Sequence, residues 1–150
     1  MLAVQAHSGS SFRFWRPARG EATLRSPARA ILDDVGLGER SGMLAANLAH
    51  GEQRALEIAT ALATRPRLLL LDEPVAGMGA EETQRMIAFL STLKGSKTLI
   101  LVEHDMDAVF SLADRISVLV YGRIIATGTP REVRANAEVR RAYLGEEVAA

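Results

Sequence analysis

Length, composition and charge narrow the class of protein. The chain has 150 residues, 48% of them hydrophobic, which is enough for one globular domain with a core. Its 18 Lys and Arg balance 18 Asp and Glu, so net charge provides no attraction to nucleic acid or an anionic membrane. The absence of cysteine excludes disulfides, thiol catalysis and cysteine-based metal sites, and it is compatible with a reducing cytoplasm. No apolar run approaches the roughly 20 residues of a membrane-spanning helix.

The first 25 residues have the least regular pattern. Between His7 and Gly20, serine, glycine and proline are mixed with arginines and with the aromatic residues Phe12, Phe14 and Trp15. We interpret this stretch as a surface loop or insertion. A transit peptide and a segment that binds nucleic acid through basic and aromatic side chains are the alternatives.

Two helices are predicted next. Ser26 as N-cap and Pro27 as first helical residue predict a helix that runs through Val35 and is stopped by Gly36. A second helix is predicted to start near Gly51, because several apolar residues follow the spacing of one helical face: Ala55, Ile58, Ala59 and Leu62.

The start of the second helix has two interpretations. The free amides and the positive end of the helix dipole point back at His50 and Gly51, where they can receive a phosphate. The alternative is an ordinary helix start at which glycine only eases the turn.

Four leucines, Leu68 to Leu71, predict a strand, since the run is too short for an ordinary helix and lies between Pro66 and Pro74. Because no polar residue alternates with them, we expect both faces to be buried, as in a parallel sheet covered by helices.

Asp72 and Glu73 follow at the carboxyl end of this strand, where open α/β sheets bind ligands. Along an extended chain their side chains would point to opposite sides and could do different work. Asp72 could serve Mg²⁺, and Glu73 could orient and deprotonate a water. A polar boundary between strand and turn is the competing interpretation.

The following segment alternates helix and strand. A glycine-containing loop over 75–79 precedes a predicted helix over 80–93, a second buried strand over 98–102, and a helix capped by Asp105. This order predicts a right-handed crossover and a parallel sheet. His104 would then end on the same edge as Asp72, where it could meet a developing phosphate charge; a hydrogen-bonded structural histidine is the alternative.

The last third predicts a β-hairpin and two short helices. The strands are 116–120 and 123–126, joined by Tyr121-Gly122. Thr129 and Pro130 predict the start of a helix, and a final helix carries 139–144.

These motifs together resemble one family. The segments Leu48–Glu52, Leu68–Pro74, Gly77-Met78-Gly79 and His104, in this order and spacing, resemble the carboxyl-terminal half of an ABC transporter ATP-binding subunit. The likeness covers about residues 25 to 147. It is greatest for the ATPases of branched-chain amino acid, urea or amide importers, through Glu103-His104-Asp105-Met106, Gly128-Thr129-Pro130 and Ala142-Tyr143-Leu144-Gly145-Glu146.

The resemblance implies a fold and a domain organisation. It implies an α/β protein, the carboxyl-terminal part of a P-loop NTPase fold, with a mostly parallel sheet flanked by helices, part of a helical subdomain and a terminal β-hairpin. Residues 1–65 would belong to the helical subdomain and residues 66–150 to the ATPase core.

The resemblance also implies roles for individual residues, consistent with phosphoryl transfer as a problem of positioning and charge stabilisation. Asp72 would be the Walker B carboxylate that holds Mg²⁺ through water, Glu73 the base, and His104 the switch histidine at the γ-phosphate. The signature loop, Leu48, Ala49, His50, Gly51 and Glu52, would reach ATP held by a partner in a head-to-tail dimer. The loop 76–79, with Gly77, Met78 and Gly79, would couple the two sites.

Some residues depart from the family pattern. Ala49 stands where Ser is usual, His50 replaces a common Gly, Glu52 a common Gln, and Gly79 a frequent Asp. The sequence contains no G-x-x-x-x-G-K-[ST], the loop that cradles the β- and γ-phosphates. We therefore expect the chain to begin inside the helical subdomain, to hydrolyse little ATP alone, and to leave its strands with an uncovered edge and apolar faces that favour association.

The expected function is an ATP-binding and ATP-hydrolysing subunit that couples ATP hydrolysis to uptake of branched-chain amino acids or related amides. Its expected partners are a second ABC ATPase subunit, membrane permeases and, indirectly, a periplasmic or extracellular solute-binding protein, but not nucleic acid. It would act at the cytoplasmic face of the membrane. The alternative is a non-catalytic accessory or decayed half-domain that pairs with a complete ABC ATPase.

Overall fold

The computed structural model describes residues 1–8 and 22–144. These residues belong to two compact units, Met1–Glu103 and His104–Ala150, which we describe separately. The stretch interpreted as a loop, a transit peptide or a nucleic-acid-binding segment lies mostly outside the described residues, as do Gly145 and Glu146. The expected division near residue 65 stays a prediction.

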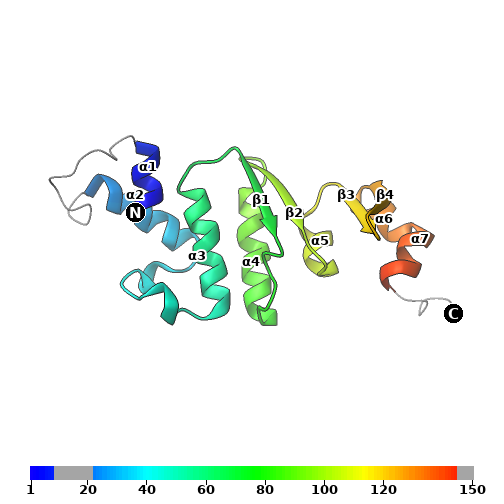
Figure 1. Cartoon of the computed structure of the whole chain (residues 1–150), viewed down its shortest axis with the longest axis horizontal. Helices are drawn as coiled ribbons and strands as arrows, with labels where there is room; N and C mark the ends of the chain where they lie inside the picture. Colours follow the sequence, from blue (N-terminus) through cyan, green and yellow to red (C-terminus); the bar gives the residue numbers. More distant parts are fainter. Residues whose placement is uncertain (9–21, 145–150) are drawn as a thin grey trace. The chain divides into compact units, whose positions relative to one another are not determined.

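The first unit begins with helices (Figure 1), and side chains from them form a small core. Buried Val4, Leu24 and Ala63 form this core, and Ala3, Ala28 and Ile31 pack against it. The elements are α1 (Leu2–Ser8), α2 (Ala22–Asp34), two 3₁₀ turns (Gly38–Arg40 and Ala45–Asn47) and α3 (His50–Leu62).

The start of α2 differs from the prediction. The helix begins at Ala22 and encloses Pro27, which we expected as its first residue. The difference has a tertiary cause: Leu24, only 2% exposed, packs with Val4 and Ala63, and such packing outweighs local start signals. Residues 2–8 are also helical where we expected irregular structure. The predicted stop is confirmed, since Gly36 has the left-handed φ of 76° that glycine favours.

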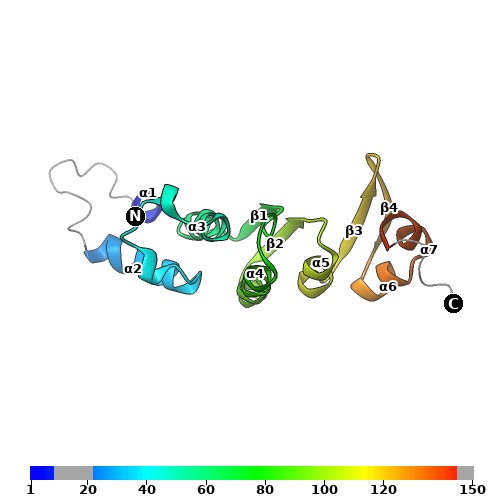
Figure 2. The same cartoon turned by 90° about the horizontal axis from the view of Figure 1, so that it is seen from below.

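Two strands of the first unit pair in parallel, as predicted. They are β1 (Leu68–Asp72) and β2 (Thr98–Val102), aligned from Leu68 opposite Thr98 to Asp72 opposite Val102. Between them in sequence comes α4 (Ala80–Leu93), which lies along one face of the pair (Figure 2). Leu69 and Leu71 of β1 are buried, as are three residues of α4: Met86, Ile87 and Leu90.

The prediction that both strands are buried on both faces is wrong for the described residues. Leu68 and Leu70 are 52% and 68% exposed, and Ile100 and Val102 are exposed as well. The cause is that no described element of the first unit covers this second face. The expectation of an uncovered apolar surface on these strands is therefore confirmed.

The second unit is built on a hairpin. Its elements are α5 (Met106–Leu112), β3 (Ile116–Val120), β4 (Arg123–Gly128), α6 (Pro130–Ala135), α7 (Ala137–Val139) and a π-helical turn (Arg140–Leu144). The strands are antiparallel, and Tyr121 and Gly122 both have positive φ, as a tight hairpin turn requires. Ile116, Val133 and Val139 form its core.

The predicted helix caps of the second unit are confirmed. Asp105 accepts the Ala108 amide at 2.9 Å at the start of α5, and Thr129 accepts the Glu132 amide at 3.3 Å at the start of α6, where Pro130 is the first residue. Among the helices that the structure describes in either unit, none has the length and apolarity to cross a membrane.

Burial along β1 predicts how leucine substitutions affect stability. Leu69→Ala should lower the free energy of unfolding by about 2–5 kcal/mol, because Leu69 is only 4% exposed and its loss leaves a cavity. Leu70→Ala, next in the same strand, should change it by only about 0.5 kcal/mol. Urea unfolding of both variants measures the difference, and equal effects would contradict the burial pattern.

The cap of α6 predicts a pH dependence. The Thr129 amide donates to Glu132 Oε2 at 2.7 Å, and this bond, followed by the Thr129 hydroxyl, lowers the pKa of Glu132 below its ordinary value. Since the folded-state pKa is the lower one, the resulting stabilisation should be present above the ordinary pKa and lost as pH falls through the lowered pKa.

Thermal unfolding between neutral and acidic pH tests this. Glu132→Gln should flatten the acid-side fall in midpoint temperature, whereas Glu138→Gln in α7 is the control that should retain it. An identical acid profile for wild type and Glu132→Gln would be evidence against the cap as its source.

Candidate functional site

The carboxyl ends of β1 and β2 lie at one edge of the sheet. Asp72 ends β1 opposite Val102, and the Glu73 amide donates to the Val102 carbonyl at 2.8 Å. Asp72 and Glu73 are both exposed, so both carboxylates are accessible at the edge where we expected a site. The chain leaves the extended conformation at Glu73, whose φ is 47°, so the alternation argument does not extend to its side chain.

The loop after Glu73 is an ordered turn. The Ala76 amide donates to the Glu73 carbonyl at 3.1 Å, and the Met78 amide to the Val75 carbonyl at 3.2 Å. The Val75 amide donates to the side chain of Glu103 at 3.1 Å. Sequence reasoning assigned no role to Glu103; its position directly after the second strand was the available signal.

The predicted signature loop is held by its own helix. Leu48 is buried, α3 begins at His50, and the Gln53 side chain donates to the Leu48 carbonyl at 3.0 Å. The Gln53 amide donates to the Ala49 carbonyl at 2.9 Å. Gln53, which sequence reasoning missed, thus fixes the loop to the first turn of α3.

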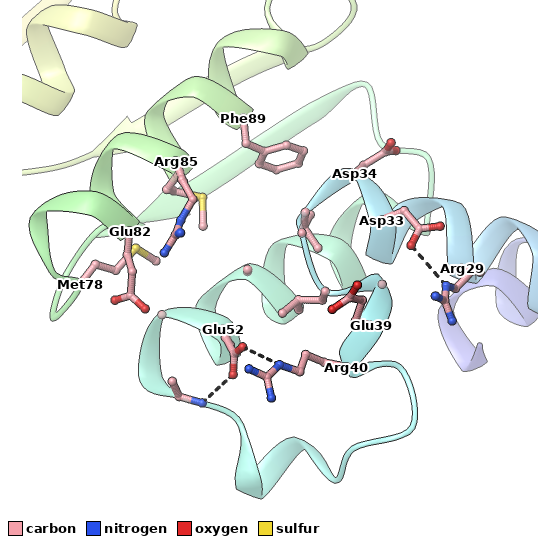
Figure 3. A pocket seen from close by; sticks show the side chains of 18 residues that line it. Arg29, Asp33, Asp34, Glu39, Arg40, Glu52, Met78, Glu82, Arg85 and Phe89 are labelled. Atoms are coloured by element: carbon pink, nitrogen blue, oxygen red, sulfur yellow. Dashed lines mark hydrogen bonds and ion pairs between the residues drawn. The ribbon is translucent and has the colours of Figure 1, made fainter.

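The carboxylate of Glu52 has partners in this loop. Its Oε2 accepts the Ala49 amide at 3.0 Å, and its Oε1 pairs with Arg40 Nε at 3.3 Å (Figure 3). Arg40 is a second residue that sequence reasoning missed, because no local pattern links it to the start of α3. The guanidinium of Arg40 thus balances the negative charge of Glu52, which lies at the positive end of the α3 dipole.

The predicted signature loop and the loop 76–79 meet in the first unit. A Cβ added to Gly77 would lie 2.8 Å from Cδ2 of His50, so the imidazole already lies against the glycine. A Cβ added to Gly51 would lie 2.9 Å from Oε2 of Glu82, and this oxygen accepts the Gly79 amide at 3.2 Å. The structure therefore brings two of the predicted groups of residues together at the starts of α3 and α4.

A cavity of about 870 Å³ opens beside this meeting point, between residues of α2, α3 and α4 (Figure 3). Three arginines line it, and each forms an ion pair with a carboxylate: Arg29 with Asp33, Arg40 with Glu52, and Arg85 with Glu81. The positive charges of the wall are thus already compensated, which makes the cavity a poor site for a phosphate.

The remaining predicted site residue opens the second unit. His104 follows β2 by two residues, and its place relative to Asp72 and Glu73 stays a prediction. Within 1–8 and 22–144, no group of three or more His, Asp or Glu side chains is arranged to hold a metal ion by itself. Asp72 as a Mg²⁺ ligand therefore stays a prediction too.

The close approach of His50 to Gly77 makes a testable prediction. Gly77→Ala should destabilise the protein by about 1–3 kcal/mol, because it adds left-handed strain at φ 72° and displaces the imidazole. Gly95→Ala is the matched control, with φ 82° and open space around the added methyl.

Denaturant unfolding of the two variants separates the effects. Gly77→Ala should cost more than Gly95→Ala, and adding His50→Ala should recover only the excess. Equal costs for the two glycines would show that the imidazole does not crowd Gly77.

Two family models and several curated proteins are similar to this chain. A family model described as "ABC transporter" matches residues 5–76, and one described as "Branched-chain amino acid ATP-binding cassette transporter" matches residues 123–149. The high-affinity branched-chain amino acid transport ATP-binding protein LivG of Salmonella typhimurium is 44% identical over 134 residues, 88% of this chain and 52% of LivG. BraF of Pseudomonas aeruginosa, of the same description, is 40% identical over 97% of this chain and 60% of BraF.

Solved structures give the same family. One is an ATP-binding cassette of an ABC transporter in its ADP conformation, with 28% identity and a TM-score of 0.74 over 93% of this chain and 56% of that one. Another is a nucleotide-free ATP-binding cassette, with 25% identity and a TM-score of 0.76 over 97% of this chain and 61% of that one. The chain thus spans about half to three fifths of the length of these relatives. It belongs to the ATP-binding proteins of ABC transporters, of the branched-chain amino acid type, and corresponds to their carboxyl-terminal part.

Proposed function

We propose that this chain supplies the Walker B, signature and switch-histidine residues of a subunit that couples ATP hydrolysis to import of branched-chain amino acids or related amides. The observation that carries the proposal is the position of Asp72 and Glu73. Both are exposed carboxylates at the shared carboxyl edge of β1 and β2, and the amide of Glu73 is bonded to β2.

The residues at this edge fit ATP with Mg²⁺ in their chemistry. Carboxylate oxygens are ligands that Mg²⁺ prefers, and an exposed Asp72 leaves room for the water through which the metal would be held. Glu73 would polarise the attacking water, and His104 would contact the γ-phosphate. Bound Mg²⁺-ATP would supply the phosphoryl group and the metal charge that stabilises its transfer.

The start of α3 would serve the second half of a composite site. The helix has 13 residues and an ordered first turn, so its dipole and its first amides would face a phosphate presented by a partner subunit. The usual serine hydroxyl is absent at Ala49, but the backbone of Gly51 remains. Arg40 offsets the extra negative charge of Glu52.

The subunit would act as one part of a transporter in the membrane. Partners would be a second ABC ATPase subunit, whose nucleotide the signature loop would contact, and permeases that the dimer would bind at the cytoplasmic face of the membrane. A solute-binding protein would act through those permeases. The relatives are named for branched-chain amino acid transport, which supports this class of solute.

A chimera tests the function. In LivG of Escherichia coli strain K12, the segment that aligns with this chain over 134 residues would be replaced by the residues of this chain. The chimera should support leucine uptake in cells lacking LivG. Glu73→Gln in the chimera should reduce ATP hydrolysis by the purified transporter about 100-fold or more, because the general base is lost.

Glu81→Gln is the matched control, since Glu81 is an exposed carboxylate on α4 paired only locally with Arg85. Hydrolysis that survives Glu73→Gln would overturn the role given to Glu73. An inactive chimera, together with co-purification of this chain with complete LivG that is lost on Gly51→Asp, would instead support the accessory function.

A further inference from the structure

Glu103 connects the end of β2 to the loop that follows Glu73. It comes directly after Val102, the last residue of β2, and is half-buried. Its Oε1 accepts the Val75 amide at 3.1 Å. The bond joins residues 28 positions apart in the sequence, so it is a tertiary contact.

The backbone at Glu73 needs such support. Its φ of 47° is a left-handed conformation that residues other than glycine rarely adopt. Such a conformation persists only where its surroundings hold it, and it often occurs where a side chain must be presented in a particular direction. Here the bond from the Glu73 amide to the Val102 carbonyl and the turn closed by Ala76 hold the residue.

The sequence explains why a side chain supplies the next bond. The regular ladder to β2 ends at Glu73, because its φ of 47° takes the chain out of the extended conformation, and the next residue, Pro74, has no amide hydrogen. Val75 is the first following residue with an amide to donate. Glu103, directly after Val102, reaches that amide with its carboxylate and takes the place of the missing ladder bond.

We propose that Glu103 is a positioning residue, which holds the turn after Glu73 against the end of β2 and so fixes the direction of the Glu73 carboxylate. The inference rests on the proposed function only for its catalytic consequence. The bond itself needs an acceptor rather than a charge. Gln at position 103 should therefore replace Glu, and Ala should not.

Amide hydrogen exchange in the 150-residue chain tests the bond without any nucleotide. Glu103→Ala should speed exchange of the Val75 amide by about tenfold or more, whereas Glu103→Gln should leave it within about threefold. The amide of Leu90, a fully buried residue of α4, is the control for global unfolding, and its exchange rate should not change. Unchanged exchange at Val75 in Glu103→Ala, or equally fast exchange in Glu103→Gln, would overturn the proposal.

A second variant covers the case in which Glu103→Ala does not fold. Glu103→Met keeps the length of the side chain but offers no oxygen, and it should behave as Ala at Val75. If Ala and Met both unfold the chain while Gln does not, Glu103 supports the whole fold rather than this turn, and the proposal is wrong.

The catalytic consequence is tested in the LivG chimera. Glu103→Ala should lower kcat for ATP hydrolysis by about tenfold with little change in KM, and Glu103→Gln should restore it. If the unmodified chimera shows no Glu73-dependent hydrolysis, the proposed function fails while the exchange result stands. If the chimera is active and Glu103→Ala speeds exchange without lowering kcat, the positioning role fails by itself.

Discussion

The register between β1 and β2 is the constraint on which the candidate site depends. Because Asp72 lies opposite Val102, the residues that follow both strands emerge at one edge. A shift of one residue would exchange the two faces of a strand, moving Leu69 and Leu71 out of the core and their exposed neighbours into it. The burial of Leu69 and Leu71 therefore fixes where Asp72 and Glu73 leave the sheet.

A second constraint fixes the loop after β1 against α3. Gly77 lies so close to His50, and Gly51 to Glu82, that a methyl group at either glycine would crowd the opposite side chain. The Gly77 contact involves a ring and a left-handed backbone, so it has little freedom to adjust. At Gly51 the crowding atom is the end of a flexible carboxylate, which can move at small cost. The contact between the loop and α3 at Gly77 is thus less adjustable than the contact between α3 and α4 at Gly51.

The sequence predicted the elements whose signals are local. The helix over 80–93, the hairpin and the caps at Asp105 and Thr129 follow from periodicity or turn chemistry within a few residues. The parallel pair follows from the order strand, helix, strand. The start of α2 could not be predicted in this way, because it depends on the packing of Leu24 against Val4, which is 20 positions earlier in the sequence. The left-handed φ of Glu73 could not be predicted either, because it is supported by the hydrogen bond from its amide to β2. An apolar run shows what a strand is suited to contact, so it could not reveal that one face of β1 stays exposed among the described residues.

The departure from the family pattern at Glu52 shows how a local substitution depends on distant residues. A carboxylate at the start of α3 interacts favourably with the positive end of the helix dipole, yet it would repel a phosphate brought to the same amides. The structure directs this carboxylate to the Ala49 amide and to Arg40, so its charge is shared with partners on the protein. The ion pair is partly exposed and adds little to stability, but it reduces the field that a phosphate would meet. Glu52 and Arg40 therefore form one electrostatic unit, so in the proposed function the effect of either residue on a phosphate at α3 would depend on the presence of the other.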